Sequence, residues 1–219
     1  MSTKKRLLRV YERLNRFFGD LHWWPGETPF EVCVGAILTQ NTNWSNVEKA
    51  IGRLKAEGVL EPNTLFSLDD DTLAEKIRPS GYFRVKTKRL KAFLAVLCGE
   101  FSGDVDRMLS GDLFWVRQRL LEIPGVGEET ADSMLLYAGG RPVFVVDAYT
   151  RRILTRHGLL KGSPSYGQIQ RLFMENLPPD VDLYNQYHAL IVETAKRYCR
   201  KEPDCGDCPL RGMREEGKG

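Results

Sequence analysis

The chain has little of what marks a membrane or a secreted protein. Its 219 residues include five cysteines, an odd number that cannot close into a complete disulfide framework. The longest apolar run, Val32 to Leu38, is far too short to span a bilayer. Charged residues occur throughout segment 1–14, where a signal peptide needs an apolar stretch. We therefore expect a cytoplasmic protein that does not contact membranes, and we expect a monomer.

Strand patterns are also scarce, and the sequence holds no fixed-period repeat or low-complexity segment. The stretch from Pro142 to Val146 alone is strand-like, and five residues cannot make a sheet. Elsewhere apolar residues recur at helical spacing between turn residues, so the predicted fold class is all-α. The expected helices cover residues 5–18, 29–38, 45–54, 69–77, 85–100, 113–121, 129–137, 147–156, 166–176 and 183–198.

The net positive charge is small, but the basic residues are unevenly distributed along the chain. The formal charge of +3 says little about partners by itself. However, segment 84–91 holds five basic residues and no acid, and segment 141–161 holds five against the single acid Asp147. Such clusters fit a polyphosphate surface, although a solvated helix face explains about half of runs like these.

The most informative stretch lies at residues 120–131, where a glycine-rich turn separates two helical patterns. After Ile123 the sequence reads Pro124-Gly125-Val126-Gly127. Glycine permits left-handed backbone and close approach, and free N–H groups at a helix start attract an anion. The turn is therefore a candidate phosphate site without base preference, whereas its simplest interpretation is a helix–turn–helix corner.

The longer string Leu120 to Ala131 resembles the helix-hairpin-helix of the endonuclease III superfamily of DNA glycosylases. In that family the hairpin is followed by a connector and an essential aspartate that opens the next helix. Here Asp147 follows Val143 to Val146 at the expected separation. A fixed carboxylate stabilises the oxocarbenium-like state of N-glycosidic hydrolysis and orients water, so the resemblance makes Asp147 the catalytic residue. Its alternative is a helix N-cap.

Glu129 occupies the position where bifunctional family members carry a Schiff-base lysine. A carboxylate cannot attack the anomeric carbon as an amine does and then allow β-elimination. The resemblance therefore implies a monofunctional enzyme that uses water and leaves an abasic site.

Three further segments resemble the endonuclease III-type 3-methyladenine DNA glycosylases. They are residues 22–25, 38–44 and 188–196. An alkylated purine is cationic, so its ring is expected to stack on electron-rich aromatic faces. The resemblance places Trp23, Trp24, Pro25, Trp44 and Lys196 around the base. Core packing is the alternative for each tryptophan.

The resemblance also assigns contacts with double-stranded DNA that contains a damaged base. Gln40 and Asn41 fall where the superfamily inserts a polar wedge into the gap left by a flipped nucleotide, although both residues could simply end and cap helices. The other candidate DNA-contacting residues are Gly125, Val126, Gly127, Thr130, Lys86, Lys88 and Arg151.

Two helical domains follow from the resemblance. Residues 28–135 are expected to carry the wedge and the hairpin, and residues 1–27 with 136–219 are expected to contribute Asp147. The cleft between the two domains would receive the flipped base.

The C-terminal cysteines Cys199, Cys205 and Cys208 resemble the iron–sulfur loop of many superfamily members. Closely spaced thiolates in an intracellular protein more often bind metal than not. The family uses four cysteines, and the fourth would lie near Arg214, where none occurs; a zinc site is likewise one ligand short. Two hypotheses stay open: a [4Fe–4S] cluster with a different fourth ligand, or an eroded loop without a cluster.

Two rival functions also stay open at this stage. One is an endonuclease III-like oxidised-pyrimidine glycosylase with lyase activity. The other is a non-catalytic helix-hairpin-helix DNA-binding protein, which would have no need for an anion such as Asp147 near DNA.

Overall fold

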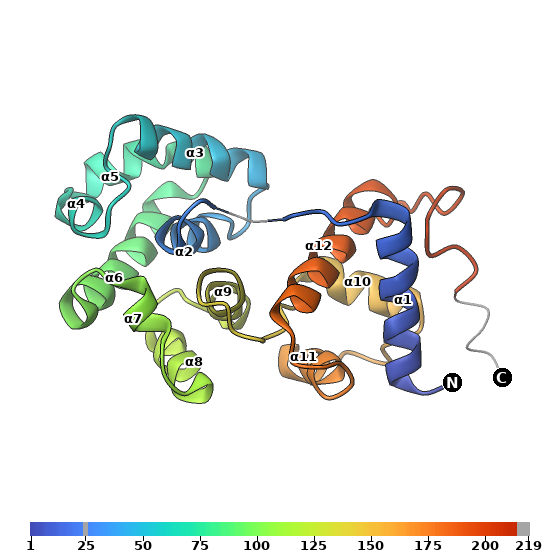
Figure 1. The fold of residues 1–219 in the computed structure, drawn as a ribbon. Coiled ribbons are helices and arrows are strands. Elements are labelled where there is room, and N and C mark those ends of the chain that lie inside the picture. The colour runs from blue at the N-terminus through green and yellow to red at the C-terminus, as the bar shows by residue number, and fades with distance from the viewer. Residues whose placement is uncertain (24–25, 214–219) are drawn as a thin grey trace. The chain divides into compact units, whose positions relative to one another are not determined.

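The computed structural model describes residues 1–23 and 26–213, and every regular element in those residues is a helix (Figure 1). The all-α prediction is confirmed. None of the described helices is long and apolar enough to cross a membrane. The elements are α1 (Thr3–Phe18), α2 (Pro29–Leu38), α3 (Trp44–Ala56), α4 (Pro62–Ser67), α5 (Asp70–Lys76), η1 (Arg78–Ser80), α6 (Phe83–Phe101), α7 (Val105–Leu109), α8 (Leu113–Glu122), α9 (Glu128–Ser133), η2 (Met134–Ala138, a π-helical turn), α10 (Ala148–Arg156), α11 (Tyr166–Met174) and α12 (Val181–Arg197).

Polar side chains start several helices where the sequence predicts it. The Thr28 hydroxyl accepts the Glu31 N–H ahead of Pro29, and Asn43 accepts the Asn46 N–H, both at 3.1 Å. These caps satisfy amides that have no partner within the helix. The sequence missed α4 and α7, because helices of six and five residues are too short to show a periodic pattern.

The strand-like segment before Asp147 is not a strand in the structure. Its side chains from Val143 to Val146 are buried, but its backbone bonds to side chains of α11 rather than to a neighbouring strand. Gln170 donates to the Phe144 carbonyl at 2.8 Å, and the Val146 N–H donates to the Tyr166 hydroxyl at 3.3 Å. Helix side chains thus satisfy the extended backbone that leads to Asp147.

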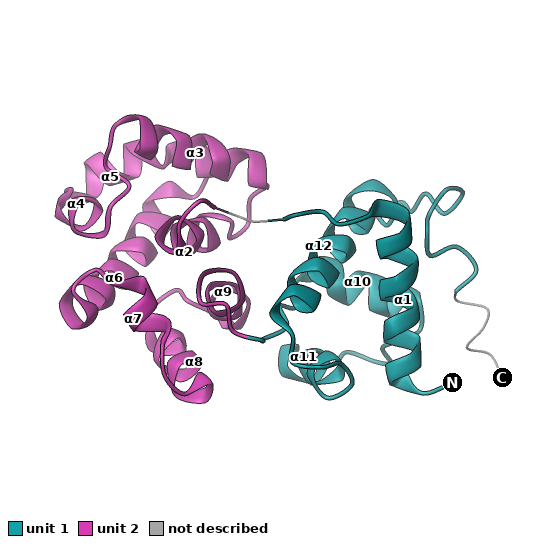
Figure 2. Cartoon of the chain, viewed as in Figure 1, with its two compact units in different colours: residues 1–23, 142–219 teal, residues 24–141 magenta. Residues whose placement is uncertain are grey.

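The chain divides into two compact units (Figure 2). Unit 1 comprises residues 1–23 and 142–219, and unit 2 comprises residues 24–141. The domain boundaries expected from the sequence, 28 and 135, lie a few residues inside the limits of unit 2.

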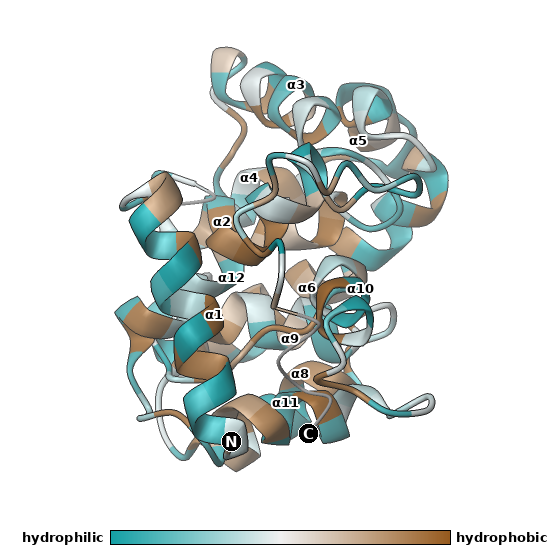
Figure 3. Cartoon of the chain, turned by 90° about the vertical axis from the view of Figure 1, so that its right-hand side faces the viewer, coloured by the Kyte–Doolittle hydropathy of each residue, from teal (hydrophilic) through white to brown (hydrophobic). Residues whose placement is uncertain are grey.

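Unit 1 has α12 at its centre, packed against α1 and α10. Hydrophilic and hydrophobic residues alternate along α1 (Figure 3), which turns Leu7, Val10 and Leu14 into the core. The Tyr187 hydroxyl on α12 donates to the Leu7 carbonyl at 2.8 Å, so α12 is joined to α1 by a buried hydrogen bond as well as by apolar contact.

Unit 2 is built around α6, which contacts α2, α4, α5 and α7. Helix α2 is buried on almost every side, as its run of apolar residues predicts. The glycine-rich hairpin joins α8 to α9 within this unit.

Candidate active site

Asp147 is the N-cap residue of α10 in unit 1, and its side chain is only 12% exposed. Its Oδ1 accepts the Thr150 N–H at 2.7 Å. Burial raises the pKa of the Asp147 carboxyl, but attraction to His188 and hydrogen bonds from His188 and Thr150 outweigh burial, so the pKa lies below its usual value. The group is therefore a buried carboxylate at neutral pH. The helix-capping role of Asp147 does not exclude a catalytic role, because Oδ1 accepts the capping hydrogen bond and Oδ2 takes no part in it.

His188 on α12 is the side chain that faces Asp147 Oδ2. Its Nε2 lies 3.5 Å from that oxygen, about half an ångström beyond the usual hydrogen-bond length. The Trp23 ring stacks on the His188 imidazole, with 5.6 Å between the centroids and 28° between the planes. The structure thus brings together the predicted carboxylate and one predicted pocket aromatic through a histidine that the sequence did not single out. The sequence signal that could have identified His188 is its position on the apolar face of a helix.

The other predicted pocket residues lie in different environments. Trp24 and Pro25 are outside the described residues. Trp44 is the first residue of α3 in unit 2, and its ring lies over α2 at Gly35, where the absent side chain leaves room for it. Lys196 is exposed on α12, eight residues beyond His188 and so about 12 Å further along the helix. The base-pocket assignments for Trp44 and Lys196 stay predictions.

The hairpin of unit 2 has the backbone that its sequence predicts. Gly125 has a φ of +89°, and a Cβ there would lie 2.2 Å from Cγ of Arg89 on α6. Val126 is buried, and its N–H donates to the Ile123 carbonyl at 3.0 Å. Gly127 is the N-cap of α9 and offers no side chain to the first amides of that helix. Glycine is thus required at position 125 for conformation and for packing on Arg89.

Gln40 packs against this hairpin. Its Nε2 donates to the Gly125 carbonyl and to the Thr130 hydroxyl, each at 3.0 Å, and its Oε1 accepts from Arg89. The amide thereby links the segment that follows α2 to the turn of the hairpin and to α9. The wedge role predicted for Gln40 stays a prediction. In the structure its amide also stabilises the hairpin through these hydrogen bonds.

An ion pair with a buried carboxylate joins the two helices of the same hairpin. Arg117 on α8 donates through Nε to Asp132 Oδ1 at 2.7 Å and lies 3.5 Å from Glu128. Asp132 is fully buried on α9. The sequence did not predict this ion pair, because the two residues lie on different helices on either side of the turn. Glu129, at the family position of the lyase lysine, is exposed in the first turn of α9.

The prediction that Lys86 contacts DNA phosphates is wrong. Its side chain is 1% exposed, and its Nζ donates to the carbonyls of Leu38 at 2.7 Å and Ser80 at 2.6 Å. Burial, with a smaller effect of Arg89, lowers the pKa of Lys86 to about 8. Lys86 lies on the apolar stripe of α6 with Leu90, at a spacing of four residues, and this stripe could have predicted its burial.

The two carbonyls that Lys86 binds precede two exposed residues with left-handed backbone. Asn41 has a φ of 55° and Tyr82 a φ of 45°. Positive φ is uncommon outside glycine and tends to mark functional positions. Lys86 therefore joins the segment that carries Asn41 to the segment that carries Tyr82, an exposed aromatic residue that the sequence reasoning missed.

Two other basic residues of the clusters, Lys88 and Arg151, lie in different environments. Lys88 is exposed on α6, as a phosphate contact requires. Arg151 is partly buried and donates to the Pro164 carbonyl, so its guanidinium is engaged within unit 1. The clusters are therefore not uniform DNA-facing stripes.

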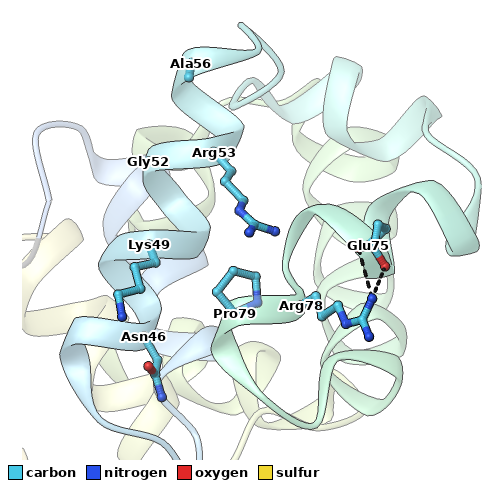
Figure 4. Close-up of a pocket in the computed structure, with 8 residues that line it drawn as sticks. All are labelled: Asn46, Lys49, Gly52, Arg53, Ala56, Glu75, Arg78 and Pro79. Atoms are coloured by element: carbon cyan, nitrogen blue, oxygen red, sulfur yellow. Dashed lines mark hydrogen bonds and ion pairs between the residues drawn. The ribbon is translucent and has the colours of Figure 1, made fainter.

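Unit 2 also has an open pocket of about 760 Å³ between α3 and η1 (Figure 4). Arg53 points into the space beside Pro79, and Arg78 on the far wall pairs with Glu75 at 3.2 Å. Lys49 also lines the pocket, and both Lys49 and Arg53 are exposed. Their spacing of four residues on one helix was the signal for a basic face.

The C-terminal cysteines Cys199, Cys205 and Cys208 are the candidate ligands for the cluster that the family implies. Cys199 and Cys208 are buried and Cys205 is exposed, but no three His, Cys, Asp or Glu residues in the described part of the chain are arranged to hold a metal ion. Arg156 lies 3.3 Å from Cys199 Sγ and donates to the carbonyls of Arg200 and Lys201. Arg214, at the fourth family position, lies outside the described residues. Within residues 1–23 and 26–213, these donors therefore do not form a site that fits a cluster.

Comparison with known proteins identifies the family. A family model described as HhH-GPD superfamily base excision DNA repair protein matches residues 34–179. The chain is 46% identical over 207 residues to a protein of Methanocaldococcus jannaschii provisionally named a DNA repair glycosylase, with 94% of each chain covered. It is 30% identical over 196 residues to endonuclease III of Thermotoga maritima, covering 87% of this chain and 86% of the relative.

Solved structures agree on the fold. An endonuclease III in a non-covalent complex with DNA has a TM-score of 0.84 at 24% identity, with 99% of this chain and 98% of that chain covered. The 3-methyladenine DNA glycosylase of H. pylori, bound to 1,N6-ethenoadenine, has a TM-score of 0.76 at 27% identity, covering 90% of this chain and 98% of that one. The chain therefore belongs to the HhH-GPD superfamily and is a base-excision-repair DNA glycosylase with an endonuclease III-like fold.

Proposed function

We propose that this glycosylase removes N3- or N7-alkylated purines such as 3-methyladenine from double-stranded DNA by hydrolysis, and that it leaves the abasic strand intact. The observation that carries the proposal is Asp147, a buried carboxylate whose pKa is lowered and whose Oδ2 is not tied to the helix cap. This group would stabilise the positive charge that develops on the sugar and orient the attacking water.

The nature of the base follows from its charge. An N3- or N7-alkylated purine is already cationic and leaves readily, so it needs a carboxylate near the sugar more than it needs an acid near the base. Its ring would be recognised by aromatic faces, for which Trp23, stacked on His188, and Trp44 are the described candidates. The similarity to a named 3-methyladenine DNA glycosylase supports the same substrate class.

The absence of strand cleavage follows from Glu129. An exposed carboxylate at the lyase position cannot form the imine on which β-elimination depends. Hydrolysis by water is then the route that remains for this site.

DNA would be gripped mainly by unit 2. The amides at the start of α9 would bind one backbone phosphate, and exposed cations would bind others. Lys88, Lys49 and Arg53 are candidates for those contacts because their charges are exposed. Asn41, exposed with a left-handed backbone, is the candidate for the wedge.

The test is a base-release assay over a panel of lesions in one duplex sequence. We expect release of 3-methyladenine from methylated duplex DNA, no release of oxidised pyrimidines, and no strand break before alkali is added. Release of oxidised pyrimidines alone would contradict the proposal.

A second candidate is an endonuclease III-like oxidised-pyrimidine glycosylase with lyase activity. The 30% identity to an endonuclease III favours it. Borohydride reduction during turnover separates the candidates, because only a lyase forms a reducible imine with DNA. We expect no trapped protein–DNA adduct.

A further inference from the structure

His188 occupies a position between the proposed catalytic carboxylate and the aromatic predicted for the base pocket. It lies on the buried face of α12 and is 5% exposed. Its Nε2 approaches Asp147 Oδ2 at 3.5 Å, and its ring stacks on Trp23. The His188 side chain therefore contacts both the candidate carboxylate and the candidate aromatic Trp23.

The contact with His188 restrains the rotation of the Asp147 carboxylate, which the helix-cap hydrogen bond alone leaves free. The Thr150 N–H fixes Oδ1 at 2.7 Å, but a single hydrogen bond does not set the plane of a carboxylate. An imidazole nitrogen beside Oδ2 adds the second point that defines this plane. At 3.5 Å the approach is too long to occupy the oxygen fully, so Oδ2 can still accept a proton from water.

The imidazole is itself held in place by aromatic contacts. Trp23 covers one face, and the edge-on Phe144 ring lies 6.5 Å away at 87° between the planes. Phe144 belongs to the buried segment that leads into Asp147, so the histidine and the carboxylate are supported by the same stretch of chain. Such support is what a catalytic group needs in order to keep its geometry.

We infer that His188 is a positioning residue that sets the orientation of the Asp147 carboxylate and seats Trp23. The inference rests on the proposed function, since it requires Asp147 to act on the sugar. It assigns no substrate contact to His188. Replacement should therefore slow base release without weakening the binding of DNA.

The experiment is a double-mutant cycle that combines His188→Leu and His188→Gln with Asp147→Asn. Single-turnover release of 3-methyladenine gives the rate, and fluorescence anisotropy with undamaged duplex gives the affinity. Tyr184→Phe is the matched control, because Tyr184 is buried on the same helix and packs on Phe144. Thermal melts establish which variants are folded.

We expect His188→Leu to lower the single-turnover rate about tenfold and His188→Gln to lower it less, because glutamine keeps a donor for Oδ2. DNA affinity should stay within about twofold, and Tyr184→Phe should leave the rate unchanged. In the Asp147→Asn background neither substitution at His188 should slow the residual rate further. If His188→Leu does not fold, His188→Gln carries the same prediction.

Two results would overturn the inference: an unchanged rate in both His188 variants, or an equal loss with and without the Asp147 carboxylate. Failure of the proposed function looks different. In that case Asp147→Asn alone would release 3-methyladenine at the normal rate, or no variant and no parent protein would release it.

Discussion

Lys86 in unit 2 and Asp147 in unit 1 are both ionisable side chains with little exposure to solvent, and the two are held in different ways. Lys86 in unit 2 donates to two backbone carbonyls at 2.7 and 2.6 Å. Asp147 in unit 1 has one close backbone partner, Thr150, and a longer approach to His188 at 3.5 Å. A buried charge with close backbone partners supports the fold, whereas a carboxylate with an incompletely occupied oxygen remains available for chemistry.

The largest expected effect is a difference in the free energy of unfolding between two variants, one without the Lys86 charge and one without the Asp147 charge. Lys86→Met should lower the free energy of unfolding by about 3 kcal/mol, because it leaves two buried carbonyls without donors. Asp147→Asn should change that free energy by less than about 1 kcal/mol, since asparagine also caps helices well. Chemical denaturation of both variants measures the difference. Equal losses would remove the distinction between the two sites.

A second prediction concerns the hairpin of unit 2 that we propose to hold DNA. Gly125→Ala should raise the dissociation constant for duplex DNA about tenfold, because the new Cβ collides with Arg89 and displaces the turn. Gly140→Ala is the matched control, since Gly140 also has a positive φ but has no atom within 4 Å of the added carbon. Fluorescence anisotropy measures both. Similar losses in the two variants would show that backbone strain alone is responsible.

The pH dependence of stability sharpens the account of Lys86. Its pKa is about 8 in the folded chain against 10.5 as its ordinary value, so between these pH values the unfolded chain binds more protons at this position. Stability from this group therefore rises with pH over that window. The difference in unfolding free energy between the parent protein and Lys86→Met should grow from pH 8 to pH 10. A constant difference would contradict the lowered pKa.

The smallest effect is expected from metal removal. The cysteine loop of unit 1 is held by arginine hydrogen bonds to carbonyls, including those from Arg156 to Arg200 and Lys201. Incubation with an iron chelator should therefore leave the melting temperature and the base-release rate unchanged. A loss of either, together with bleaching of a visible absorption band, would show that a cluster supports this loop.

The sequence was sufficient for the long helices and for the hairpin, because both depend on local patterns. Apolar spacing predicts α1 and α12, and glycine at position 125 is explained by a φ that side chains rarely adopt. Asp147 was found through its position after the hairpin, and the structure adds the contacts with His188 and Thr150 that lower its pKa against the effect of burial. Short helices and the extended segment before Asp147 escaped prediction, because their partners are remote in the chain.

The residues that support the candidate site could not be found in this way. His188 meets Asp147 across 41 positions of sequence, and Arg117 meets Asp132 across a turn. Only tertiary packing brings such groups together. Lys86 is different, because its position on the apolar stripe of α6 is enough to predict its burial. Its place in a cluster of basic residues led instead to the wrong prediction of a phosphate contact.

The most direct test is the single-turnover rate of 3-methyladenine release by Asp147→Asn, with Asp132→Asn as the control. Asp132 is another buried aspartate, but it pairs with Arg117 in unit 2. We predict that Asp147→Asn loses activity about 100-fold or more while still binding DNA, and that folded Asp132→Asn keeps its rate within about threefold. Base release by Asp147→Asn at the parent rate would contradict the central claim that this carboxylate performs the chemistry.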